Sequence, residues 1–187
     1  MRVGAAVVLC ILLIFSSALP AREVAGIDVA ESARVGDVAL DLNGAGVRWK
    51  FFFKIYVGAL YLSGKADNPE AVYAQVGPKR IDMHILYDEI SRDDLVEAWN
   101  DGFEGNLNSG ELAALKSRIA DFNRSFSDVK AGDQIRLEMA PATGTSVWIR
   151  GEQKATIPGD DFALALLKIW LGNSPADNGL KSAMLGG

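Results

Sequence analysis

The stretch GAGVRWKFFFKIYVGALYL, residues 44–62, constrains the fold more than any other part of the chain. Its aromatic and β-branched residues predict a long strand from Val47 to about Leu62. Side chains of a strand alternate between its two faces. We expect helices to cover one face, which carries Trp49, Phe51, Phe53, Ile55, Val57 and Ala59. The opposite face carries Arg48, Lys50, Phe52, Lys54 and Tyr56.

The rest of the chain adds further strands and helices. VALDLNGAGVRW, residues 38–49, predicts a hairpin that turns at Asn43–Gly44. More strands are predicted at KRIDMHILYDE, residues 79–89, and three times within residues 133–157. Caps and helical spacing predict helices that begin near Pro69, Ser91, Ser109, Asp160 and Pro175. This order favours an α+β fold, an open-faced sandwich in which helices cover one side of a large antiparallel sheet.

The N-terminus has the layout of a secretory signal peptide. Arg2 is followed by an apolar run from Val3 to Phe15 and then by SSALPA. The small residues predict cleavage after Ala18 or Ala21, which leaves residues 22–187 as one domain; an uncleaved N-terminal anchor is the alternative. The apolar run is shorter than the ~20 residues of a bilayer span, so we expect no stable membrane span after processing.

The composition of the processed chain excludes several classes of function. Cys10, the only cysteine, lies within the signal peptide, so no disulfide or thiol site is expected, which suits a periplasmic or secreted protein. Without residues 1–21, the chain has 18 Lys and Arg and 24 Asp and Glu, which gives a net charge of 18 − 24 = −6. This negative charge argues against nucleic-acid binding. No glycine-rich phosphate loop or metal-ligand cluster is present, so we expect no cofactor and no metal. The oligomeric state stays open.

The cations of residues 44–62 have two interpretations. Arg48 can bind a carboxylate or an enolate through two hydrogen bonds, and the Tyr56 hydroxyl can donate another. The aromatic neighbours would then hold the apolar part of such an anion. The alternative is a solvated lysine face with Arg48 paired to a neighbouring strand. The pattern alone leaves both open.

Four segments in order resemble the chalcone isomerase superfamily, and most closely its exported, bacterial chalcone isomerase-like proteins. The segments are GVRWKFFFKIYVGALYL, KRIDMHI with ISRDDLVEAW, SFSDVKAGDQIRLEMAPATGTSVWIRG, and DFALALLKIWLGNSPADNGLKSAMLG. The resemblance implies a large antiparallel sheet, a layer of helices and a ligand cleft between them. Plant chalcone isomerases close a flavanone ring in this cleft, and non-catalytic relatives bind fatty acids there.

The resemblance assigns ligand-binding roles to Arg48, Lys54, Tyr56 and Tyr61. Arg48 matches the ligand-facing arginine, and KIYVGALYL, residues 54–62, lines up with KFTAIGVYL of the plant enzymes. Tyr56 replaces a catalytic threonine, and Tyr61 matches a second tyrosine. The catalytic tyrosine after the next strand has no counterpart, because Tyr87 lies several positions early. We therefore expect a non-catalytic protein that binds a fatty acid or a similar apolar carboxylate; the alternative is an isomerase of the intramolecular lyase type.

The strand pattern and the resemblance disagree about Arg48. The period of two places Arg48 with the lysines, away from the predicted helix-covered face. A cleft on the helix side would need an extra residue in one strand, a β-bulge, before Gly58.

Overall fold

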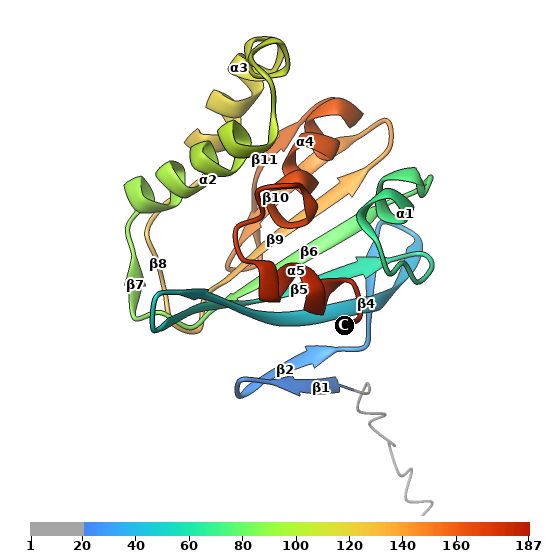
Figure 1. The fold of residues 1–187 in the computed structure, drawn as a ribbon, viewed down its shortest axis with the longest axis vertical. Helices are drawn as coiled ribbons and strands as arrows, with labels where there is room; N and C mark the ends of the chain where they lie inside the picture. Colours follow the sequence, from blue (N-terminus) through green and yellow to red (C-terminus); the bar gives the residue numbers. More distant parts are fainter. Residues whose placement is uncertain (1–20) are drawn as a thin grey trace, which may run out of the picture.

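The computed structural model describes residues 21–187, and most of the predicted signal peptide, residues 1–20, lies outside this part of the chain (Figure 1). Its main element is a seven-stranded antiparallel sheet with the order β11-β10-β9-β6-β5-β4-β3. The strands are β3 (Ser32–Val35), β4 (Val38–Lys50), β5 (Phe53–Leu62), β6 (Lys79–Ile85), β9 (Gln134–Ala140), β10 (Gly144–Ile149) and β11 (Glu152–Ile157). Two-stranded ribbons are formed by β1 (Ala21–Val24) with β2 (Ile27–Ala30), and by β7 (Glu89–Ile90) with β8 (Val129–Lys130).

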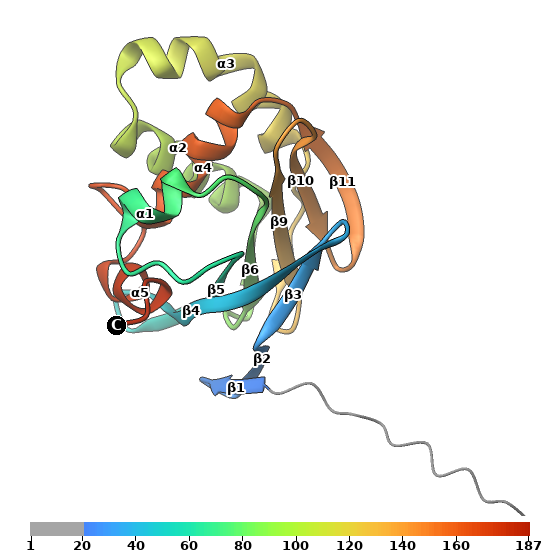
Figure 2. The ribbon, with the colours of Figure 1, turned by 90° about the vertical axis from the view of Figure 1, so that its right-hand side faces the viewer.

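Helices cover the concave side of the curled sheet (Figure 2). They are α1 (Pro69–Ala74), α2 (Arg92–Asn106), α3 (Ser109–Arg124), α4 (Asp160–Leu171) and α5 (Asn178–Met184). The predicted start of α2 is confirmed by Ser91, whose side chain accepts the backbone N–H of Asp94, and Gly172 caps the end of α4. The α+β prediction of a large antiparallel sheet with helices on one side is confirmed. None of the helices within residues 21–187 is long and apolar enough to cross a membrane.

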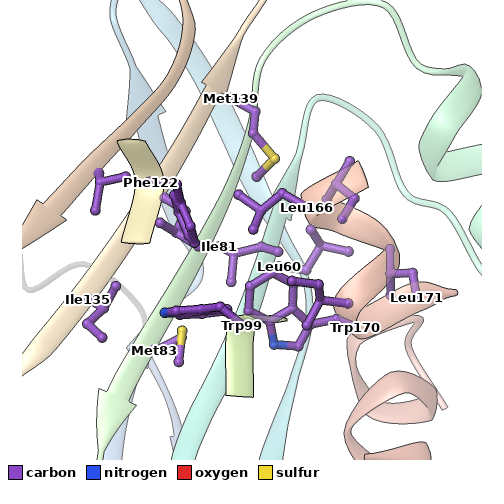
Figure 3. Packing of buried hydrophobic residues seen from close by; sticks show 14 of the residues in the cluster. Leu60, Ile81, Met83, Trp99, Phe122, Ile135, Met139, Leu166, Trp170 and Leu171 are labelled. Atoms are coloured by element: carbon purple, nitrogen blue, oxygen red, sulfur yellow. The ribbon is translucent and has the colours of Figure 1, made fainter. Parts of the chain in front are cut away.

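The main core lies between the sheet and the helices. Its centre is an aromatic cluster in which Trp99 of α2 lies 5.4 Å from Phe122 of α3 and 5.7 Å from Trp170 of α4, measured between ring centroids. Figure 3 shows these rings converging with Leu60 and Ile81 of the sheet. A smaller core on the other face joins β2 and β3 to β4 and β5 and includes Val29, Leu42, Val57, Ala59 and Tyr61.

The predicted turn at Asn43–Gly44 is wrong. Lys50 pairs with Phe53, so the hairpin turns at Phe51–Phe52, and β4 continues through Asn43 and Gly44. The stretch from residue 47 to 62 is therefore the end of one strand, a turn and a second strand.

Packing by α5 explains the glycines that suggested a turn. A side chain at Gly44 would overlap the backbone of α5, and a Cβ at Gly46 would lie 2.5 Å from the Cβ of Ala183. The buried Asn43 amide donates to the carbonyl oxygens of Ala66 at 2.8 Å and Met184 at 2.7 Å. These residues let α5 lie directly on the sheet and hold it there.

Candidate functional site

A cavity of about 620 Å³ lies between the sheet and the helices, next to the turn of the β4–β5 hairpin. This volume is within the range of small-molecule sites. The sheet contributes Arg48, Ile55, Tyr56 and Met83. Helix α2 contributes an apolar stripe, and the segment between α4 and α5 closes the cavity with Ser174, Pro175 and Ala176. Slightly more than half of this wall is apolar, so it can hold the apolar part of a ligand.

A β-bulge places Tyr56 beside Arg48 on the cavity side of the sheet. Arg48 pairs with Tyr56, but Trp49 pairs with Lys54, so Ile55 is an extra residue in β5. Ile55 and Tyr56 are consequently both buried on the helix side. The expected bulge before Gly58 is confirmed, and it puts Tyr56 on the covered face with its pairing partner Arg48.

The predicted division of residues 49–59 between the two faces is wrong because it assumed one continuous strand. Trp49, Phe51 and Phe53 were expected under the helices but are 45%, 84% and 55% exposed. Tyr56 was expected on the open face but is only 4% exposed. The turn and the bulge each change which face the following residues occupy.

The Tyr56 hydroxyl is a hydrogen-bond donor on the cavity wall. Its oxygen accepts the indole N–H of Trp170 at 2.8 Å. Burial raises the pKa of Tyr56 above the ordinary value of 10.0, so the hydroxyl keeps its proton at neutral pH. That proton is not used in the bond to Trp170 and is available to a ligand oxygen.

Arg48 is a half-buried cation without an acid partner. Its guanidinium carbon lies 5.7 Å from the centroid of the Tyr56 ring. Its Nε atom is buried and has no hydrogen-bond partner within residues 21–187, and none of the ion pairs in this part of the chain includes Arg48. The nearby Asp177 carboxylate accepts the backbone N–H of Leu180 at 2.7 Å and of Trp49 at 3.1 Å. The alternative that Arg48 is ion-paired to a neighbouring strand does not describe this arrangement.

The other two candidate residues lie away from the cavity. Lys54 is exposed, and its ammonium group lies 5.5 Å from the centroid of the Trp49 ring. Tyr61 is buried in the smaller core on the opposite face, with the guanidinium of Arg80 5.6 Å from its ring centroid. The structure thus brings together Arg48 and Tyr56 of the four candidates.

Acidic residues also line the cavity. They are Asp94, Glu97 and Asp101 of α2 and Glu89 of β7. Their spacing along α2 places them on one edge of the helix. A carboxylate in the cavity would be repelled by these acids and attracted to Arg48, so the charges favour Arg48 as the position of a ligand's carboxylate.

Several cavity residues were not identified from the sequence. Leu95 and Trp99 of α2 have the spacing of a helical stripe, which predicts burial but not a cavity. Trp170, which orients Tyr56, looked like an ordinary core residue. Tyr87 lines the cavity and packs edge-on against Phe53, with ring centroids 5.6 Å apart, although its position in the sequence did not match the catalytic tyrosine of the plant enzymes.

Comparisons with known proteins identify the fold. A family model described as chalcone isomerase-like matches residues 21–186. A solved structure of a fatty-acid binding protein from Arabidopsis thaliana is similar, with a TM-score of 0.62 and 18% sequence identity over 86% of this chain and 92% of that chain. A search of curated protein sequences found no match.

Proposed function

Because the chain belongs to the chalcone isomerase-like family, we propose that it is an exported, non-catalytic protein that binds a fatty acid or a similar apolar carboxylate. The ligand's carboxylate lies at Arg48 and Tyr56, and its hydrocarbon part extends along the apolar cavity wall. The fatty-acid binding protein with the same fold supports this class of ligand. Export is supported by the N-terminal sequence alone, through Arg2, the apolar run and SSALPA.

The unpaired Arg48 guanidinium is the observation that carries the proposal. A half-buried cation without an acceptor is unfavourable, and a bound carboxylate removes this penalty. Charge-assisted hydrogen bonds contribute about 1.5–3 kcal/mol each. Removing Arg48 should therefore weaken binding about tenfold to a hundredfold.

Displacement of a fluorescent fatty acid tests this function. Arg48→Ala should bind the acid more weakly by the factor above, and Arg48→Lys should recover only part of the affinity, because an ammonium group cannot form the two-point contact. Arg34→Ala is the matched control, since Arg34 is exposed and bonds only within its own turn.

The methyl ester of the same acid separates charge from apolar contact. It should bind wild type and Arg48→Ala with similar, low affinity. Equal binding of acid and ester by wild type would overturn the proposal, as would an Arg48→Ala variant that behaves like Arg34→Ala. Intact-mass measurement of the protein from the periplasmic fraction tests export, and the expected N-terminus follows Ala18 or Ala21.

A further inference from the structure

The tip of the β4–β5 hairpin is an exposed aromatic surface, which we call the aromatic tip. It consists of Trp49, Phe51, Phe52 and Phe53, which are 45%, 84%, 92% and 55% exposed. Single exposed apolar residues are common on folded proteins, but a contiguous group of large ones marks a contact surface. Figure 1 shows this turn at the end of the sheet, below the N-terminal end of α2.

The backbone at the tip is unfavourable for the residue that it carries. Phe51 has φ +57°, in the left-handed region that glycine and asparagine adopt readily and bulky residues rarely adopt. Two-residue hairpin turns favour those smaller residues. A phenylalanine that is both exposed and conformationally strained does not stabilise the fold of the isolated chain. Such a residue indicates a function outside the fold.

Lysines flank the aromatic tip on both strands. Lys50 and Lys54 are exposed, and Lys54 lies over the ring of Trp49. Aromatic rings beside lysines suit the interface of a bilayer, where the rings enter the acyl boundary and the ammonium groups reach lipid phosphates. Within the hairpin tip, residues 49–54, the charged side chains are Lys50 and Lys54, whereas the acids of the cavity, Glu89, Asp94, Glu97 and Asp101, belong to β7 and α2.

The aromatic tip is continuous with the cavity, because Lys50, Phe51 and Phe53 also line it. We propose that the tip inserts into the surface of a bilayer that contains anionic phospholipid and holds the cavity mouth against it. An acyl chain then passes between bilayer and cavity without crossing water. This last step rests on the proposed function, whereas insertion of the tip does not.

Phe52 is suited to a test because it is the most exposed tip residue and does not line the cavity. Binding of purified protein to vesicles of phosphatidylglycerol and of phosphatidylcholine can be measured by flotation. Losing one inserted phenylalanine should weaken binding of Phe52→Ser about tenfold. Phe52→Trp should bind as well as wild type. Val76→Ser is the control, because Val76 is 94% exposed outside the tip and should not affect binding.

Two further measurements separate insertion from other contacts. Lys54→Gln should weaken binding to phosphatidylglycerol vesicles about fivefold, with little effect on phosphatidylcholine. Lipids with a quencher near the headgroup should reduce tryptophan fluorescence in wild type and do so less in Trp49→Phe. Wild type that floats with neither vesicle would overturn the proposal, as would Phe52→Ser that binds like Val76→Ser. A dimer in wild type that Phe52→Ser dissolves would identify the tip as a contact between copies and would also overturn it.

The vesicle assay needs no fatty acid, so its result is independent of the ligand. Vesicle binding by a protein with no affinity for fatty acids in solution would refute the proposed function and leave tip insertion intact. Fatty-acid binding without vesicle binding would refute tip insertion and leave the proposed function intact. Transfer of a fluorescent fatty acid from the protein to vesicles should slow about tenfold in Phe52→Ser, since transfer then requires passage through water.

Discussion

Replacing Tyr56 by phenylalanine removes one oxygen and tests how the cavity wall is held to α4. The Tyr56 hydroxyl accepts the Trp170 indole N–H at 2.8 Å, and the two residues are 4% and 1% exposed. In Tyr56→Phe the indole N–H stays buried without an acceptor, which lowers the free energy of unfolding by about 1–3 kcal/mol. In a domain of this size each kcal/mol lowers Tm by about 2–4 °C. We expect a decrease in Tm of about 2–12 °C.

Tyr73→Phe is the matched control for this change. The Tyr73 hydroxyl is also buried but has no hydrogen-bond partner within residues 21–187, so its removal should leave the free energy of unfolding unchanged or raise it slightly. The assay is thermal and chemical unfolding followed by circular dichroism. A cycle that adds Trp170→Phe and the double variant should show a coupling energy of about 1 kcal/mol. Equal Tm changes in Tyr56→Phe and Tyr73→Phe, with an additive cycle, would refute this account.

Three other predictions concern the fold and the chemistry. Gly46→Val should lower the free energy of unfolding by about 1–3 kcal/mol, because its side chain meets Ala183, whereas Gly64→Val enters open space and should not; chemical denaturation measures both. Burial lowers the pKa of His84, so the folded state holds the imidazole neutral. The free energy of unfolding should therefore fall as the pH drops below 6.5, the pKa of the unfolded state. In thermal melts, the pH dependence of Tm should differ between wild type and His84→Gln only in this pH range. Chalcone absorbance should decay at the spontaneous rate, and turnover that requires Arg48 would contradict this.

The fold class could be predicted because its signals are local and repeated. Helix caps such as Ser91 depend on neighbours within a few residues. The position of the hairpin turn could not be predicted. Asn43–Gly44 has turn chemistry, but contacts with α5, more than a hundred residues later, override it. Phe51 carries no turn signal, since its residue type disfavours the conformation that it adopts.

The candidate site was predictable only in part, because local residue types suggested Arg48 but distant contacts decide which side chains reach the cavity. A permanent cation beside aromatic residues identified Arg48. The turn that the sequence did not predict puts Arg48 on the face of Ile55, and the bulge at Ile55 adds Tyr56 to that face. The residue types of Lys54 and Tyr61 do not reveal whether each side chain lies in the cavity, on the surface or in the smaller core on the opposite face. Their faces depend on where the turn and the bulge fall. Trp170 reaches Tyr56 from 114 residues away, a distance that periodicity cannot bridge.

The packing of α5 on Gly44 and Gly46 has a consequence for folding during synthesis. The ribosome synthesises β4 long before α5. The hydrogen bond from the Asn43 amide to the carbonyl oxygen of Met184 can form only after another 141 residues have been added. Until then the glycine surface of the hairpin is bare, and the segment that closes the cavity beside Ser174 has no anchor on the sheet. α5 therefore cannot dock on the hairpin until the chain has been made as far as Met184. Nascent chains should stay susceptible to protease and to chaperones until translation has passed this helix.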